Sequence, residues 1–206
     1  MKPIKIIIID DHPVVLQGFN FMLQDIAGME LTGQFTDAAA GIEFMAKNPV
    51  NVVLLDINLP DMNGIDACAA IKRLHPQTHV LAISNINEYS IIQRMLASGA
   101  AGYLLKNASS EEVVACIHRV MNGQTGISEG VRTILARRQS GELPVVTRRE
   151  KEILVLLAEG LSSQEIGDKV FISPLTVESH RRNLLQKFKV TNVAALIHKA
   201  SEWKYI

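Results

Sequence analysis

Residues 4–11 read Ile-Lys-Ile-Ile-Ile-Ile-Asp-Asp, and residues 51–56 read Asn-Val-Val-Leu-Leu-Asp. Both segments are apolar at nearly every position and end in aspartate. Strands that are apolar on both faces are typical of a parallel sheet covered by helices on both sides. Further short apolar runs at 30–35, 78–83 and 101–104 are separated by amphipathic stretches near 13–26, 37–47, 64–74, 88–97 and 109–121. The alternation predicts an α/β domain of the doubly wound type, with a five-stranded, mostly parallel sheet over residues 4–9, 30–35, 51–55, 78–83 and 101–104.

The pattern changes after residue 122. No further strand is expected there, and a helix is expected near 128–138, followed by Gln139-Ser140-Gly141-Glu142-Leu143-Pro144, which is typical of a linker. From Thr147 onward the chain is predicted to be helical. We therefore expect a first domain at 1–122, a linker at 123–142 and an all-α domain at 143–206.

Composition and charge agree with two domains. The 206 residues are 48% hydrophobic and 20% charged, which excludes low-hydrophobicity disorder. No apolar run approaches the roughly 20 residues of a membrane span, and two cysteines argue against a disulfide framework or zinc module. Residues 1–122 carry a net charge of −4 and residues 179–206 one of +5, so a polyanionic partner is expected for the second domain. Without a signal peptide at Met1-Lys2-Pro3-Ile4, we expect a cytoplasmic protein.

Three carboxylates follow two of the predicted strands. Asp10 and Asp11 follow the first, and Asp56 follows the third. In open parallel sheets, ligands bind outside the carboxyl ends of the strands, and crowded carboxylates repel one another unless a cation lies between them. Magnesium fits best, because it takes one or two carboxylates and also holds phosphate oxygens. The fourth and fifth strands bring a hydroxyl, Ser84, and an amine, Lys106, which suit the remaining phosphoryl oxygens.

Taken singly, these residues have simpler explanations. An aspartate at a strand end is more often a loop residue or a helix cap, and Asp10-Asp11 before His12-Pro13 could be such a capping pair. His12 reads as a loop residue, since no second histidine is suitably placed. The coincidence of Asp10, Asp11, Asp56 and Lys106 at equivalent strand ends outweighs these explanations.

Several motifs together resemble the receiver domain of bacterial two-component response regulators over roughly residues 4–122. They are Ile8-Ile9-Asp10-Asp11-His12, Leu54-Leu55-Asp56-Ile57-Asn58-Leu59-Pro60, Asn63-Gly64, Ser84 and Gly102-Tyr103-Leu104-Leu105-Lys106. The resemblance implies a flavodoxin-like fold and phosphorylation by a sensor histidine kinase. It makes Asp56 the phosphoacceptor and assigns Mg²⁺ to Asp10, Asp11, Asp56 and the backbone carbonyl of Asn58.

The resemblance also implies a group of residues that respond to the phosphoryl group. Lys106 would pair with it, Ser84 would move to hydrogen-bond it, and the Tyr103 side chain would follow Ser84. Asn107 replaces the proline that many receivers carry after this lysine, and a cis bond before a non-proline residue costs about 2.5–4 kcal/mol. A trans Lys106–Asn107 bond is therefore expected.

Two other classes of function remain open. A phosphotransferase of the haloacid dehalogenase type also uses an aspartate at a strand end, but it places a second aspartate two positions later as general acid. Here that position is Asn58, which cannot exchange a proton in that role. A protein-binding module with a helical adaptor is the third possibility.

The second domain shows the helix start and stop signals expected of a helix-turn-helix unit. Thr147 and Glu150 fit a capping box, Gly160 is a natural helix stop, Ser162 or Ser163 can cap a short helix, and Ser173-Pro174 opens a longer one. On a helical wheel of residues 175–188 the apolar Val177, Leu184 and Phe188 share one face. The opposite face and flanks carry Leu175, Glu178, Ser179, Arg181, Arg182, Asn183, Leu185, Gln186 and Lys187.

This helix could enter a major groove, although an ordinary amphipathic surface helix fits the wheel equally well. Arg182 could read guanine and Glu178 could accept a hydrogen bond from cytosine. Ser179 and Gln186 lie on the same face, and Arg181, Lys187 and Lys189 suit phosphate contacts.

Residues 143–206 resemble the LuxR-type DNA-binding domain, as in NarL/FixJ-type response regulators. The residues that carry the resemblance are Thr147-Arg148-Arg149-Glu150, Leu157-Ala158-Glu159-Gly160-Leu161-Ser162, Glu165-Ile166, Ile172-Ser173, Thr176-Val177, His180 and Lys187-Phe188. The resemblance implies promoter binding as a homodimer, with Glu178 where many members have lysine. Val193, Leu196 and Ile197 of the last helix suit either a dimer surface or the domain's own core.

Overall fold

The structure, a computed structural model, describes residues 2–139, 143–203 and 205–206. Contacts within the chain divide it into two compact units, residues 1–134 and 135–206, called here the first and second units. Among the described residues, no helix has both the length and the apolar character that crossing a bilayer requires.

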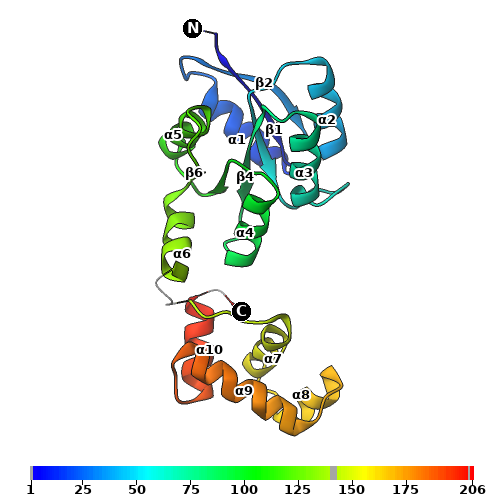
Figure 1. Cartoon of the computed structure of the whole chain (residues 1–206), viewed down its shortest axis with the longest axis vertical. Coiled ribbons are helices and arrows are strands. Elements are labelled where there is room, and N and C mark those ends of the chain that lie inside the picture. Colours follow the sequence, from blue (N-terminus) through cyan, green and yellow to red (C-terminus); the bar gives the residue numbers. More distant parts are fainter. Residues whose placement is uncertain (1, 140–142, 204) are drawn as a thin grey trace. The chain divides into compact units, whose positions relative to one another are not determined.

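A parallel sheet forms the centre of the first unit (Figure 1). Its strand order is β2-β1-β3-β4-β5-β6, and every neighbouring pair is parallel. The first five strands in this order are those of the flavodoxin-like fold. The strands are β1 (Ile4–Ile9), β2 (Met29–Phe35), β3 (Val52–Asp56), β4 (His79–Ser84), β5 (Gly102–Leu105) and β6 (Gly126–Ile127).

The sixth strand corrects the prediction of a five-stranded sheet that ends before residue 122. β6 has two residues, too short for an alternation of apolar and polar positions to show in the sequence. Its pairing with β5 depends on two glycines that face each other in register, Gly102 and Gly126. A Cβ atom on Gly102 would lie 1.9 Å from the carbonyl oxygen of Gly126, so any larger side chain would separate the strands.

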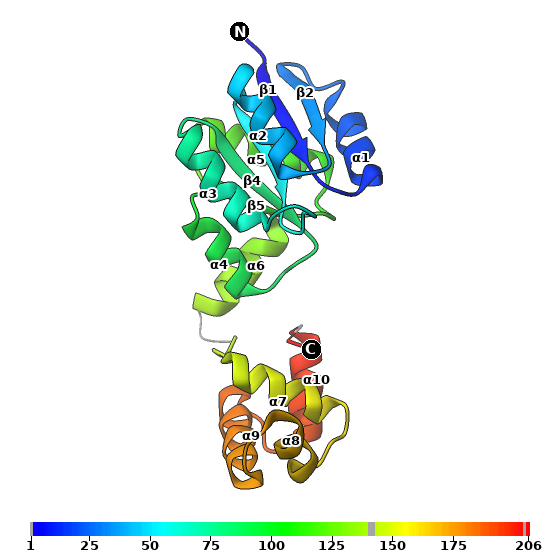
Figure 2. The ribbon, with the colours of Figure 1, turned by 90° about the vertical axis from the view of Figure 1, so that its right-hand side faces the viewer.

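Helices cover both faces of the sheet (Figure 2). Ile6 and Ile8 of β1 pack in one buried cluster with residues of α1 and α5, whereas a Cβ atom on Gly41 of α2 would collide with Ile9. Because successive strand residues face opposite sides, a run of buried isoleucines serves both layers. The helices are α1 (Pro13–Leu23), α2 (Ala38–Lys47), α3 (Gly64–Leu74), α4 (Tyr89–Ala97) and α5 (Ser110–Met121).

Four helices build the core of the second unit. They are α7 (Arg148–Ala158), α8 (Ser163–Val170), α9 (Pro174–Phe188) and α10 (Val193–Glu202), and α6 (Glu129–Gln139) precedes them across the division between the units. Thr147 and Ser162 cap α7 and α8 in complete capping boxes, and Ser173 caps α9 with Pro174 in its first turn. These helix starts agree with the sequence prediction.

Each of these four helices contributes apolar side chains from one of its faces to the core of the second unit. The wheel's apolar face is buried as predicted, and Leu196 and Ala200 of α10 lie in the same cluster, with Val193 packed against it. The α10 stripe therefore serves the unit's own core through Leu196 and Val193. The buried members are Ile153, Leu154, Leu157, Ile166, Val177, Leu184, Phe188, Leu196 and Ala200.

Candidate functional site

Three strands deliver charged side chains to one edge of the sheet in the first unit. Asp10 follows β1, Asp56 is the last residue of β3, and Lys106 follows β5. Parallel strands end at the same edge, which brings these residues together although up to 96 positions separate them in the sequence. Asp10 is 0% exposed and Asp56 is 1% exposed, so the cluster lies inside the protein.

The Lys106 ammonium joins the two buried carboxylates. Its Nζ atom lies 3.0 Å from Asp56 Oδ2 and 2.7 Å from Asp10 Oδ2. The other Asp56 oxygen accepts a 2.7 Å hydrogen bond from the Ile57 amide. Asp10 Oδ2, in contrast, has no hydrogen bond of good geometry in the described part of the chain. The Lys106 ammonium is thus the charged partner of both carboxylates, and one positive charge does not neutralise two negative ones.

The charges in this cluster are strongly coupled. Burial raises the pKa of Asp56, although the hydrogen bond and positive charge of Lys106 partly oppose the rise. Burial also disfavours the charged form of Lys106, but Asp10 and Asp56 outweigh it and raise the pKa of this lysine. Lys106 therefore stays protonated, while two carboxylates share one ammonium. An additional cation would favour the ionised form of Asp56.

Four residues place possible metal ligands close together. Asp10, Asp11, His12 and Asp56 each offer one ligand atom, and these atoms lie within 4.8 Å of one another. The three aspartates offer oxygen ligands, which magnesium prefers, whereas His12 offers a ring nitrogen. The sequence favours a loop residue over a metal ligand for His12, and in the structure its Nδ1 lies 2.6 Å from Asp11 Oδ1. Its direct adjacency to Asp10-Asp11 was the only signal of this contact.

The loop after Asp56 is fixed by its own backbone. Asn58 pairs with Asn63 in an isolated bridge, and the Gly64 amide donates a 2.8 Å hydrogen bond to the Ile57 carbonyl. A Cβ atom on Gly64 would lie 2.3 Å from the Asp56 carbonyl oxygen, so only glycine allows α3 to begin here. Asn58 is thereby held two residues from Asp56, at the edge where the carboxylates gather.

Ser84 and Tyr103 are both 0% exposed and contact the same loop residue. The Ile86 amide donates a 3.1 Å hydrogen bond to Ser84 Oγ, and the Tyr103 hydroxyl donates a 2.7 Å hydrogen bond to the Ile86 carbonyl. Burial raises the pKa of Tyr103 to about 12, with an opposing contribution from Ser84. Each described peptide bond is trans, including Lys106–Asn107, as expected. The Lys106 amide donates a 3.0 Å hydrogen bond to the Ser84 carbonyl.

The side chains predicted to contact DNA differ in their exposure and in whether they are already paired with another side chain. Ser179, Arg182, Gln186 and Lys189 are exposed on α9 or at its end. Arg181 lies 3.2 Å from Glu178, which also accepts a hydrogen bond from the Ser163 hydroxyl. These partners lower the pKa of Glu178, with Ser163 the largest cause, so its carboxylate is ionised and already bound.

Lys187 is half-buried and pairs with a carboxylate of its own unit. Its Nζ lies 2.7 Å and 2.6 Å from the two carboxylate oxygens of Glu150, which is 4% exposed. The same carboxylate closes the capping box with Thr147. The sequence suggested a phosphate contact for Lys187 and did not connect it to Glu150, because 37 positions separate them.

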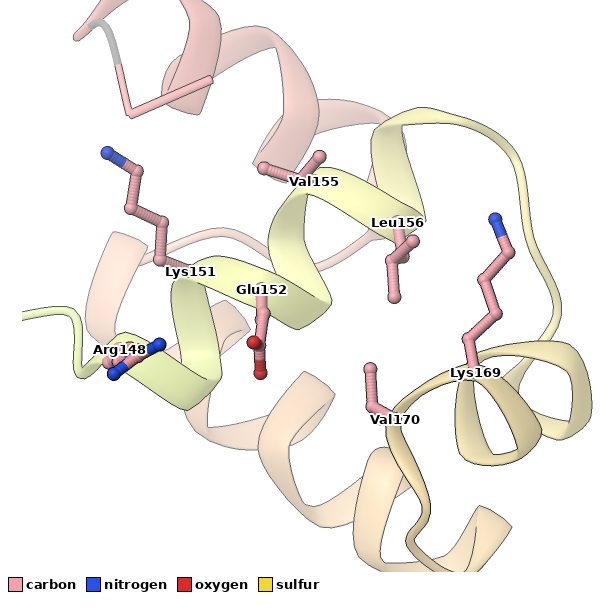
Figure 3. A pocket seen from close by; sticks show the side chains of 7 residues that line it. All are labelled: Arg148, Lys151, Glu152, Val155, Leu156, Lys169 and Val170. Carbon is pink, nitrogen blue, oxygen red and sulfur yellow. The ribbon is translucent and has the colours of Figure 1, made fainter.

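A groove of about 520 Å³ lies between α7 and α8 (Figure 3). Apolar side chains of Val155, Leu156 and Val170 line it together with one carboxylate, Glu152. The remaining lining residues are the cations Arg148, Lys151 and Lys169. No serine, cysteine or histidine is among them, whereas the carboxylates and the ammonium that could act on a phosphoryl group gather at the sheet edge.

Two family models match the chain. Residues 6–118 match the response regulator receiver domain. Residues 144–200 match the bacterial regulatory proteins of the luxR family. The two matches lie in the first and second units respectively.

Similar proteins extend over almost the whole length of the chain. The transcriptional regulatory protein MctR of Rhizobium johnstonii is 37% identical, over 96% of this chain and 92% of its own. The nitrate/nitrite response regulator NarP of Escherichia coli is 32% identical, over 95% and 94%. A solved structure of Salmonella enterica RcsB, bound to a promoter in the presence of the phosphomimetic BeF3−, is 28% identical with a TM-score of 0.67, covering 97% of this chain and 98% of that one.

Proposed function

The chain belongs to the two-component response regulators that join a receiver domain to a LuxR-type DNA-binding domain, and we propose that Asp56 is the residue through which phosphorylation controls it. Proteins of this kind are phosphorylated by sensor histidine kinases, dimerise and bind promoter DNA. The observation that carries the proposal is the buried cluster of Asp10, Asp56 and Lys106. It is the place where a phosphoryl group would meet both a nucleophilic carboxylate and a fixed ammonium.

We propose that Asp10, Asp11, Asp56 and the backbone carbonyl of Asn58 hold Mg²⁺. The three neighbouring carboxylates, of which the buried two share a single ammonium, support this choice because magnesium prefers oxygen ligands. Bound there, the ion would supply positive charge to the carboxylates and to a phosphoryl oxygen.

The residues of the cluster can then carry out one transfer. A carboxylate oxygen of Asp56 attacks the phosphorus of the kinase phosphohistidine. The new P–O bond forms as the P–N bond breaks, and the leaving nitrogen keeps the electron pair, so a ring protonated on its other nitrogen departs as neutral imidazole. Lys106, held 3.0 Å from Asp56 Oδ2, is placed to pair with a transferred phosphoryl oxygen.

Ser84 and Tyr103 are proposed to report the loaded state. Their hydrogen bonds to Ile86 tie both to the β4–α4 loop. A hydroxyl that left the Ile86 amide for a phosphoryl oxygen would release this tie and favour another packing of the loop and Tyr103. The phosphoryl group would thus bias a two-state element.

For the second unit we propose base contacts from Glu178, Ser179, Arg182 and Gln186, and phosphate contacts from Arg181, Lys187 and Lys189. We keep the functional boundaries at 1–122 for the receiver domain, 123–142 for the linker and 143–206 for the DNA-binding domain.

The bacterial chromosome lies in the cytoplasm, and we place the protein there. Asn58 at the position of a general acid supports a lasting signal over enzymatic turnover.

Replacement of Asp56 by Ala tests the phosphoacceptor. The full chain is incubated with acetyl phosphate and Mg²⁺, and intact mass measures the added phosphoryl group. Wild type should gain it and Asp56→Ala should not, because the variant has no carboxylate at this position. Asp25→Asn, which removes an exposed carboxylate elsewhere in the first unit, should be labelled like wild type. Labelling of Asp56→Ala, or none of wild type, would contradict the proposal.

A further inference from the structure

An exposed leucine stands in the first turn of α9. Leu175 is 80% exposed, whereas the apolar side chains on the opposite side of the helix, Val177, Leu184 and Phe188, are 0% exposed. The preceding turn carries a second exposed apolar side chain, Phe171, which is 91% exposed. Single exposed leucines are common and need no explanation. Here, however, apolar surface is concentrated where the helix begins.

Leu175 shares its side of α9 with the residues proposed to read bases. Arg182 follows seven positions later, so the two lie about 20° apart around the helix and about 10 Å apart along it. The Ser179 hydroxyl, on the same face, donates a 3.0 Å hydrogen bond to the Leu175 carbonyl. Its proton is thereby engaged with the helix backbone, and the Leu175 isobutyl group is the chief apolar feature of this face.

We infer that Leu175 recognises a thymine by packing against its C5-methyl group. A recognition helix contacts base edges in the major groove with its N-terminal residues, and thymine alone presents a methyl group there. A leucine can neither donate nor accept a hydrogen bond, so it distinguishes bases only by this apolar contact. The inference rests on the proposed function of α9 as the DNA-reading helix, and it adds a specificity residue to that helix.

The position of Leu175 also limits where the thymine lies. An axial separation of about 10 Å corresponds to about three base-pair steps of 3.4 Å. The thymine should therefore lie within about three base pairs of the base pair that Arg182 reads.

The test replaces thymine by deoxyuridine, which lacks only the C5-methyl group. Bound DNA is first selected from a random pool with the full chain treated with acetyl phosphate and Mg²⁺. Each thymine of the selected site is then replaced singly, and Kd is measured by fluorescence anisotropy at one salt concentration. Wild type should lose about fourfold in affinity at one thymine per half-site, which corresponds to the about 0.8 kcal/mol of one buried methyl group.

The variants identify the residue responsible. Leu175→Ala should bind the thymine site more weakly and show no further loss with uracil at that position. Val145→Ala, which shortens another exposed side chain of the second unit (62% exposed), should keep the wild-type response. Arg182→Ala should relax the base preference within about three base pairs of the sensitive thymine.

Two results would overturn the inference. One is a Leu175→Ala variant that keeps the full uracil response, and the other is a wild type that no single uracil affects. Absence of any sequence-specific, salt-dependent DNA binding by the wild type would instead refute the proposed function of the second unit, so the two failures are distinguishable.

Discussion

Glu150 stabilises the second unit at two places. Its carboxylate accepts the Thr147 amide at 2.8 Å within the capping box and both of its oxygens contact Lys187 of α9. Burial alone would raise the pKa of Glu150, but the Lys187 and Thr147 hydrogen bonds outweigh burial and lower it. A carboxylate with a depressed folded-state pKa contributes stability above its unfolded-state pKa and loses it as the pH falls through the folded value.

We predict that the second unit loses stability as the pH falls below the ordinary glutamate value of 4.5. Urea unfolding followed by Trp203 fluorescence measures the free energy of unfolding at each pH, and Glu150→Gln should flatten its acid dependence. At neutral pH, Lys187→Met should lower the free energy of unfolding by about 1–3 kcal/mol, because it leaves the buried carboxylate of Glu150 without its ammonium partner. The salt slope of DNA binding should also fall by about one charge in this variant, because Lys187 is proposed to contact a phosphate. An unchanged salt slope would limit Lys187 to its contact with Glu150.

At the scale of elements, three helices end in a residue with a positive φ angle, and the residue type differs among the three. The chain leaves α7 through Gly160 at φ 85°, α8 through Phe171 at φ 57° and α9 through Lys189 at φ 53°. All three are left-handed conformations, which cost an L-residue about 1–2 kcal/mol and glycine little. The Phe171 side chain is 91% exposed, so its packing offsets almost none of the free-energy cost of this backbone conformation.

Phe171→Gly should therefore stabilise the second unit, by about 0.5–1 kcal/mol after the extra chain entropy of glycine is subtracted. Gly160→Ala should destabilise it, because a Cβ atom is introduced at φ 85°. Thermal melts of the two variants should shift Tm in opposite directions. A lower Tm for Phe171→Gly would show that the aromatic ring contributes packing in solution.

At the scale of the whole molecule, the ligand sites proposed here belong to separate units. The carboxylates of the proposed Mg²⁺ site lie in residues 1–134, and the DNA-reading helix lies in residues 135–206. Each unit has its own buried core. A ligand that binds only the folded state stabilises the unit that holds it, by RT ln(1 + [L]/Kd).

Calorimetry of the full chain should show two unfolding transitions, of which Mg²⁺ raises only the one that belongs to the first unit. At a concentration 100 times Kd the gain is about 2.7 kcal/mol. Asp10→Asn should remove most of this response, since it removes one of the buried negative charges that the ion would neutralise. Phe171→Gly should shift the Tm of the second unit alone, which identifies the other transition. An equal Mg²⁺ response in Asp10→Asn would contradict the proposed ligand set.

The sequence by itself determined the order of the elements other than β6 and the identity of the charged groups. Apolar runs such as Ile6–Ile9 and caps such as Thr147 and Ser173 are local signals, because strand and helix periods and capping hydrogen bonds involve residues close in the chain. The convergence of Asp10, Asp56 and Lys106 could also be predicted, since the carboxyl ends of parallel strands share one edge.

Only the tertiary structure decided the contacts between distant residues. The two-residue strand β6 exists because Gly102 and Gly126 let two backbones approach, which no local pattern encodes. The pairing of Lys187 with Glu150 and the sharing of one ammonium by two buried carboxylates likewise depend on the packing of elements far apart in sequence. The physical reason is the range of the interactions: periodicity is set within a few residues, whereas burial and charge pairing are set by whichever segments the fold brings together.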